Sequence, residues 1–492
     1  MTTTTALEAS IFEPPLSHKP GNRQQWGQLE GAARALALVQ AARHYQGLSL
    51  AITPDTSSAQ QLETELRFFA QAEARLPVLH LSDWETLPYD SISPHQDIIS
   101  ERLNTLYRLP QTRQGILVVP ITSLLQRLMP PSYLMGNSLV LELGEELDLE
   151  RMRHNLESAG YQCVDTVYEH GEFAVRGALI DIFPMGSDRP FRIDLFDNEV
   201  ETLRSFDPET QMTLERVSRI ELLPAREFPL DKAGIARFRN HWHARFDVDH
   251  KACPIYQDVC SGIAPPGIEY YLPLFFEASS HLFEYLPEQS QIYLLGDLET
   301  AARHFWQELE NRYENRRVDP QRPLLPPRDI YLGVDEFFGL IKPQCRTLIQ
   351  AEPVESGAGR HNFPSAPPPR LPVQAQAEQP LAALETFLMD YEGRVLFCAD
   401  SAGRRETRLE LLGRIRVSPR LLSGWQEFVE AEDSPALVVA PLDRGLRLET
   451  PELTIITESQ LFGERVQQER RRRQSQDKSD LVVKNLTELK SG

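Results

Sequence analysis

Residues 26–42, WGQLEGAARALALVQAA, join a glycine-containing turn to a stretch rich in alanine and leucine, and such a stretch predicts a helix. Many phosphate-binding proteins use a turn of this kind, because the backbone N–H groups at the start of a helix attract anions. A functional loop has the pattern G-x-x-x-x-G-K-[ST], in which the lysine contacts the phosphates and the hydroxyl residue binds Mg²⁺. Whether this loop can bind a nucleotide depends on how many of those residues it keeps.

The residues that would bind a nucleotide are replaced throughout this loop. When the pattern is aligned on Gly31, its four chemical positions are occupied by Gln28, Ala33, Arg34 and Ala35. Arg34 keeps a positive charge, but an alanine side chain has no oxygen with which to bind Mg²⁺. The alignment predicts a degenerate, inactive nucleotide loop, and the stretch taken alone fits an ordinary helix start better than a phosphate site.

After this loop the chain alternates between short apolar runs and helical patterns. Apolar runs of this length without polar alternation are typical of strands buried in a parallel sheet. Strands are predicted in GLSLAITP (47–54), LPVLHLS (76–82) and QGILVVP (114–120), with helices over 31–45, 58–73 and 96–108. The predicted fold class is therefore α/β, with residues 12–137 as one domain.

The pattern changes several times further along the chain. Residues 138–224 combine one helix with short, crowded antiparallel strands, which predicts a small α+β insert. Residues 225–350 are mixed, and 351–380 are rich in Pro, Ala, Gln and Ser, as in an extended linker. Residues 381–465 return to α/β and predict a separate small domain, and the charged stretch 466–492 predicts a linker or tail.

Composition excludes several classes of protein. The 492 residues are 41% hydrophobic and 25% charged, as in soluble multidomain proteins, and no apolar run approaches the length of a membrane helix. The five cysteines form no CxxC pair, which suits a reducing cytoplasm. A net charge of −20 repels the phosphate backbone of nucleic acids over most of the surface. Protein partners are therefore favoured over nucleic acid.

The order of motifs resembles that of one known family. The degenerate loop at 27–35 is followed by DWETLPYDSISPHQDIISERL (83–103), EHGEFAVRGALIDIFPMG (169–186) and FRIDLFDNEVETLRSFDPETQ (191–211). These segments resemble the N-terminal region of the bacterial transcription-repair coupling factors (Mfd), which is itself similar to the nucleotide-excision-repair protein UvrB. The resemblance covers essentially the whole chain. It implies a UvrB-like, RecA-like α/β domain in two parts, 1a and 1b, split by the insert as domain 2.

The resemblance also implies which activities are lost. In UvrB the matching loop is intact and hydrolyses ATP, and a long aromatic hairpin clamps damaged DNA. Here the segment 88–90 leads directly into SPHQDIISERL, which predicts a helix and leaves no room for that hairpin. We expect no catalysis and no cofactor in this chain. ATP and Mg²⁺ belong to the translocase motor of the full-length family, which is expected, with the polymerase-binding module, beyond Gly492.

Recruitment of a repair protein is the function that the resemblance implies. UvrB binds the damage sensor UvrA through its inserted domain, and the matching contact residues here are Arg176, Arg192 and Phe196. RNA polymerase and duplex DNA would be bound by C-terminal domains, and one such domain would cover domain 2 in the resting protein. A cytoplasmic location is expected, with no membrane partner.

The alternation of residues in FRIDLFD supports this interpretation. Phe191, Ile193 and Leu195 share one face of a strand, which predicts core. The other face presents Arg192 and Phe196, and arginine and aromatic residues are enriched at binding hot spots. The alternative is that Arg192 forms a surface ion pair with Asp194 or Glu172 and that Phe196 fills a satellite cluster.

Other candidate sites have simpler explanations. His241, His243, His250 and Cys253 include metal-binding types, but their spacing matches no usual zinc pattern. Asp83, Glu85 and Asp90 are expected to hydrogen-bond within the DWETLPYD turn. The charged residues Glu464, Arg465 and Arg470–Arg473 could contact DNA or polymerase, but a solvated linker helix is preferred.

Two alternative functions remain open at this level. A residual nucleotide-binding or ATPase domain would need Arg34 to replace the lysine of the loop. A direct binder of damaged DNA, like UvrB, would need a local basic surface in a chain of net charge −20.

Overall fold

The computed structural model describes residues 7–17, 19–71, 76–374, 376–431 and 434–463. Three larger sheets and one two-stranded sheet organise these residues. Within them, no helix is both long and apolar enough to cross a membrane. The charged stretch 466–492, with Glu464, Arg465 and Arg470–Arg473, lies outside the described residues.

The first sheet is parallel throughout, as the apolar runs predict. Its eight strands lie in the order β1-β16-β2-β15-β14-β3-β5-β4, and β3 and β5 are buried along their whole length. The bounds are β1 Leu7–Glu8, β2 Arg23–Gly27, β3 Leu48–Thr53, β4 Val78–His80, β5 Gly115–Pro120, β14 Ser290–Leu295, β15 Arg346–Ile349 and β16 Arg360–Asn362. Strands from both sides of the insert therefore form one sheet.

Helices cover both faces of this sheet. α1 (Ala33–His44) and α2 (Thr56–Ala70) share a hydrophobic core with one face, and α3 (Gln96–Arg108) contributes to the core on the other. The remaining helices of this part are α4 Ile121–Leu124, α5 Pro131–Gly136, α7 Lys232–Arg245, α8 Pro254–Cys260, α9 Leu298–Arg316, α10 Pro327–Ile330 and α11 Val334–Ile341. Short 3-10 turns lie at Leu109–Gln111, His250–Ala252, Ile268–Phe275 and Leu282–Glu284.

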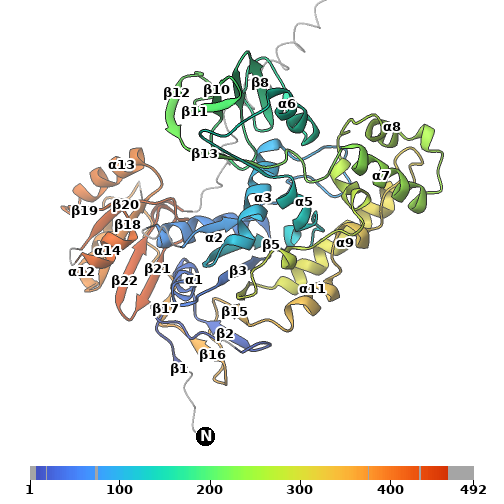
Figure 1. Ribbon diagram of the computed structural model, residues 1–492. Helices are drawn as coiled ribbons and strands as arrows, with labels where there is room; N and C mark the ends of the chain where they lie inside the picture. Colours follow the sequence, from blue (N-terminus) through green and yellow to red (C-terminus); the bar gives the residue numbers. More distant parts are fainter. Residues whose placement is uncertain (1–6, 18, 72–75, 375, 432–433, 464–492) are drawn as a thin grey trace, which may run out of the picture.

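The insert forms a second, mostly antiparallel sheet, at the top of Figure 1. Its six strands lie in the order β12-β11-β10-β9-β8-β7. They are β7 Gln162–Cys163, β8 Glu172–Arg176, β9 Leu179–Ile182, β10 Phe191–Phe196, β11 Glu199–Phe206 and β12 Thr213–Val217. β6 (Leu139–Glu142) and β13 (Arg219–Leu222) pair as a two-stranded sheet where the chain enters and leaves the insert, and α6 (Leu149–Ser158) packs into the same core.

The third sheet has the order β17-β21-β22-β18-β20-β19, with the pairs among β19, β20, β18 and β22 all parallel. Its strands are β17 Ser365–Ala366, β18 Arg394–Ala399, β19 Arg420–Leu421, β20 Ala436–Val439, β21 Leu446–Glu449 and β22 Glu452–Ile456. The helices are α12 Ala382–Asp390, α13 Ala402–Gly413, α14 Trp425–Glu430 and α15 Glu458–Phe462.

The third part, predicted as a separate small domain over residues 381–465, shares a hydrophobic core with the first. One hydrophobic core contains α1, α2 and the strands of both sheets, so the two helices lie between the sheets (Figure 1). The Trp425 ring lies edge-on to the Phe69 ring of α2, with 5.0 Å between centroids. α1 is buried on nearly every side for this reason, because a helix apolar all round needs partners on both faces.

The segment predicted to be a linker also carries sheet structure. β16 pairs with β2 of the first sheet, and β17 pairs with β21 of the third. Residues 351–380 therefore fasten the two sheets together. Their proline-rich composition conceals this, because each strand is only two or three residues long.

Candidate docking surface

The insert sheet has one covered and one open face. Ile180, Ile193 and Leu203 point into the main core. Residues directly opposite in antiparallel strands share a face, so Arg192 of β10 lies beside Asp181 of β9 and Arg204 of β11. These side chains lie on the open face.

Arg192 is fixed on this face by a two-pronged ion pair. Its Nε donates to Asp181 Oδ1 over 2.7 Å and its Nη2 to Oδ2 over 2.9 Å. The Asp181 side chain is only 1% exposed, and the guanidinium lies 4.9 Å from the centre of the Phe206 ring. Hydrogen bonding to Asp181 raises the pKa of Arg192 above its ordinary value. A planar fork held this way presents its remaining N–H groups in a fixed direction.

The partner of Arg192 therefore differs from both predicted alternatives. Asp194 pairs with Arg204 and with the Thr202 hydroxyl instead. Glu172 accepts hydrogen bonds from two backbone N–H groups of the turn before β8. A single carboxylate within the otherwise apolar ALIDIF (178–183) is the feature of the sequence that indicates a buried partner for Arg192.

Phe196 is the most exposed aromatic side chain among the described residues of this face. It ends β10 at the hairpin to β11, and 68% of it is exposed. A satellite cluster does exist on the open face, but its buried members are Val167, Ala174, Phe183 and Phe206. Phe196 is therefore an apolar side chain in solvent rather than part of that cluster.

Arg176 lies on the same face at the end of β8. Its Nη2 donates to the backbone oxygen of Asp165 over 2.5 Å and lies 3.4 Å from Thr166 Oγ1. Arg176 and Asp194 are both opposite Leu179, so they are two strands apart, or roughly 10 Å. The structure thus brings the three predicted contact residues onto one face, and their role in binding stays a prediction.

The loop at residues 27–35 has no free row of backbone donors. Gln28 and Gly31 have positive φ values of 59° and 56°. The N–H groups of Gln28 and Leu29 donate to carbonyl oxygens of residues 352 and 350, over 3.0 and 3.3 Å. The N–H of Ala32 donates to the carbonyl of Gly445 over 3.1 Å. Three backbone donors of this loop are therefore bonded to protein oxygens from other segments.

The side chains of this loop are committed as well. Ala33 and Ala35 are fully buried. Arg34 Nε lies 3.5 Å from Glu65 Oε2, and the Glu65 side chain is 1% exposed. Burial raises the pKa of Glu65 to about 7, although Arg34 opposes that shift. The cation that would have to replace the lysine is thus directed at a carboxyl group of α2.

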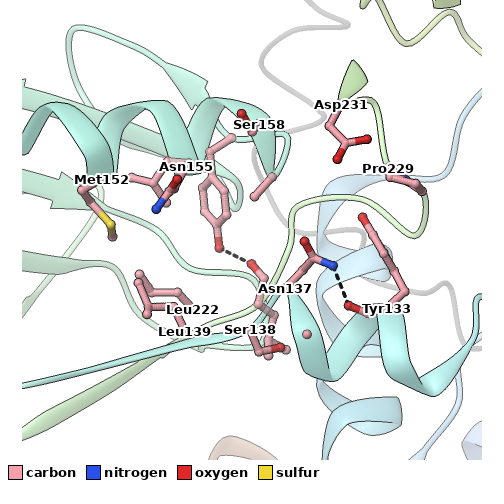
Figure 2. A pocket seen from close by; sticks show the side chains of 15 residues that line it. Tyr133, Asn137, Ser138, Leu139, Met152, Asn155, Ser158, Leu222, Pro229 and Asp231 are labelled. Atoms are coloured by element: carbon pink, nitrogen blue, oxygen red, sulfur yellow. Dashed lines mark hydrogen bonds between the residues drawn. The ribbon is translucent and has the colours of Figure 1, made fainter. Parts of the chain in front are cut away.

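A cavity of about 290 Å³ lies where the insert meets the first domain (Figure 2). Tyr133 and Asn137 from the end of α5 line it together with Leu222 of β13. Asn137 Nδ2 donates to the Tyr133 carbonyl over 2.8 Å, and Asp231 at the rim caps α7 through the N–H of Gly234 over 2.6 Å. Both of these side chains make contacts that serve local structure.

The histidines near α7 make structural contacts. His241 Nδ1 lies 3.0 Å from the Leu274 carbonyl, and His243 Nε2 lies 2.9 Å from the Tyr256 hydroxyl. Among the described residues, no group of three or more His, Cys, Asp or Glu side chains could hold a metal ion.

The carboxylates of DWETLPYD bind within and around the turn. Asp83 accepts from the Glu85 N–H over 3.1 Å and from the Thr122 hydroxyl over 2.6 Å. Asp90 forms ion pairs with Arg312 and Arg316 of α9, each at 2.9 Å.

Two family models match parts of this chain. The UvrB interaction domain matches residues 139–228, which hold the insert, and the D3 domain of MFD matches residues 387–461, which hold most of the third sheet. The segment inserted in the parallel α/β domain is therefore similar to a UvrB interaction domain.

Comparison with curated proteins gives the family. The chain is 44% identical to the transcription-repair-coupling factor of Escherichia coli over 96% of its own length and 41% of that protein. It is 41% identical to that of Haemophilus influenzae (99% and 42%) and 31% identical to that of Myxococcus xanthus (65% and 28%). The chain spans about two fifths of the length of the first two relatives. These matches confirm the predicted resemblance to the transcription-repair coupling factors.

Proposed function

We propose that this chain is a non-catalytic docking module that binds UvrA through the open face of the insert sheet. In that role it recruits UvrA to RNA polymerase stalled on damaged DNA, for transcription-coupled nucleotide excision repair. The observation that carries the proposal is Phe196, which is 68% exposed on a face where Arg192 is already held in place. The match to the UvrB interaction domain supports it.

The chemistry of the face suits a protein partner with carboxylate groups. A face that carries an exposed aromatic ring and arginine side chains can bury apolar area and form charge-assisted hydrogen bonds at once. Arg192 is already ordered by Asp181, so little side-chain entropy is lost when a partner binds it. Arg176, which is exposed and bonded only to the 165–166 segment, supplies a second cation.

We further propose that the loop at 27–35 binds no nucleotide and that the chain needs no cofactor. Arg34 faces Glu65, and Ala35 offers no oxygen to Mg²⁺. Polymerase, duplex DNA and ATP would be bound by other domains of the full-length family. A C-terminal domain covering the insert would keep the docking face closed in the resting protein, so that this chain alone would bind UvrA more tightly.

Calorimetric titration with UvrA tests the docking face. The Phe196→Ala variant is expected to weaken binding about thirtyfold or more, as for a hot-spot residue of about 2 kcal/mol. Met212→Ala is the matched control, because Met212 is 67% exposed but lies in the turn at the other end of β11.

The control variant is expected to bind like the parent chain, and both variants are expected to keep the parent melting temperature, because neither side chain is buried. Absence of binding by the parent chain, or an equal loss in both variants, would reject the proposal.

A further inference from the structure

A backbone contact just before β21 joins the third sheet to the degenerate loop. The carbonyl oxygen of Gly445 accepts the N–H of Ala32, the residue before α1, over 3.1 Å. A Cβ atom placed on Gly31 would lie 2.1 Å from that same oxygen. The two segments thus touch at a point where only glycine fits at position 31, although they are over four hundred residues apart in sequence.

A second strand of the third sheet closes the other side of the loop. Ser365 of β17 is 2% exposed, and its Oγ accepts the Glu30 N–H over 3.2 Å while donating to the Gln28 carbonyl. The Gln28 side chain in turn donates to the Ser365 carbonyl over 3.0 Å. β17 pairs antiparallel with β21, the strand that follows Gly445, so one pair of strands supplies both contacts.

The segment that carries the Gly445 carbonyl is fixed at Asp443, two residues earlier. The backbone oxygen of Asp443 accepts hydrogen bonds from the hydroxyl groups of Thr457 and Ser459 at the start of α15. A Cβ atom on Gly445 would lie 2.0 Å from the Ile455 carbonyl, so this segment also packs tightly on β22. These contacts order the backbone segment on which the Gly445 carbonyl lies.

A carbonyl oxygen is the same kind of acceptor as a phosphate oxygen, with a partial instead of a full negative charge. The start of a helix favours either, because its N–H groups lack partners within the helix. We infer that the third sheet, through Gly445 and Ser365, is a permanent internal ligand of the former nucleotide loop. It excludes phosphate from the loop and fixes the third sheet to the first as one mechanical body.

This inference gives residues 365–463 a role that does not depend on UvrA. The apolar contact of α14 with α2 adds to it, since Trp425 lies against Phe68 and Phe69. Any step that moves the third sheet must first break the Gly445 and Ser365 contacts. The loop would then become free to bind an anion.

Amide hydrogen exchange with Gly31→Ala tests this clasp. The new Cβ cannot coexist with the Gly445 carbonyl, so exchange in peptides covering 28–36 and 442–448 is expected to rise about tenfold or more. Peptides covering the insert are expected to keep the parent rate. Gly262→Ala is the matched control, because Gly262 also has a positive φ, of 78°, but has no atom within 4 Å of its Cβ position.

Ser365→Ala is a milder second variant that keeps the backbone. It leaves the Glu30 N–H without its acceptor, and exchange is expected to rise in 28–36 more than in 442–448. Inorganic phosphate and Mg·ATP are titrated into the parent chain as probes of the loop, and neither is expected to alter exchange there.

The inference fails if peptides covering 442–448 exchange at the parent rate in Gly31→Ala, just as they do in the Gly262→Ala control. It also fails if Mg·ATP binds the parent chain and increases exchange in 442–448, because the loop would then be accessible.

Discussion

Arg192 and Phe196 lie on one strand but would contribute to the proposed binding in different ways. Phe196 contacts solvent and can be removed with little effect on folding. Arg192 holds the buried Asp181 carboxylate, so it belongs to the fold and to the surface at once. A variant at Arg192 therefore changes both the stability of the fold and the surface, whereas a variant at Phe196 changes the surface alone.

A double-mutant cycle on Arg192 and Asp181 measures this dual role. Arg192→Ala leaves a carboxylate that is 1% exposed without its partner, and unfolding free energy is expected to drop by about 3 kcal/mol. The double variant Arg192→Ala/Asp181→Ala is expected to regain part of that stability but not UvrA binding. Chemical denaturation and calorimetry give the two values. Parent-like stability of Arg192→Ala would contradict the prediction.

Glu65 makes stability depend on pH. Its pKa is raised to about 7 by burial, from an ordinary value of 4.5. Between these values the folded chain keeps a proton that the unfolded chain has released, so stability falls as pH rises. Burial raises the pKa of Glu269 to about 7 as well, with the same sign.

The variant Glu65→Gln removes one of these two groups. Its melting temperature is expected to fall less than that of the parent chain between about pH 5 and about pH 8. Thermal unfolding across that range is the measurement, and parallel curves for the two proteins would count against a raised pKa at Glu65.

At the level of elements, a buried ion pair ties α3 to the segment that returns from the insert. Arg102 of α3 is fully buried, and its Nε donates to Glu227 Oε1 over 2.9 Å. The other oxygen of Glu227 accepts Trp84 Nε1 over 3.0 Å. Arg102 Nη1 also donates to the Ser82 carbonyl over 2.6 Å. Three segments that are distant in sequence meet at this pair.

Removal of this carboxylate is expected to loosen all three segments. Glu227→Ala leaves a buried guanidinium without its partner, which costs about 3–5 kcal/mol of unfolding free energy. The control is Glu157→Ala, which breaks the exposed Arg153–Glu157 pair of α6 and is expected to cost at most about 0.5 kcal/mol. Urea denaturation compares the two, and similar losses would show that the buried pair has no special weight.

At the level of the whole molecule, the negative net charge disfavours duplex DNA as a partner. A net charge of −20 opposes binding to duplex DNA wherever no basic surface is gathered. Fluorescence anisotropy with a lesion-containing duplex is expected to detect no specific binding at about physiological salt. Tight binding that weakens steeply with added salt would favour the alternative of a direct damage binder.

The arrangement of the sheets also operates at this scale. α1 and α2 lie between two sheets in one core, so the third sheet and the first share their main apolar contact. Sequence analysis predicted the buried strands of the first sheet from their apolar runs. The packing of the third part on α1 and α2 was not predicted, because an alanine-rich helix does not reveal which of its faces meets a second sheet.

The sequence by itself determined the α/β class, the core face of β10 and the presence of Arg34 and Ala35 where a phosphate-binding loop would carry a lysine and a hydroxyl residue. Each of these is a local property, carried by residue type and spacing. Only the tertiary structure decided that Asp181 pairs with Arg192, that the Gly445 carbonyl accepts the N–H of Ala32 and that Glu227 pairs with Arg102. Such contacts join strands, loops and helices whose separation in sequence carries no periodic signal, and they exist only once the sheets have packed.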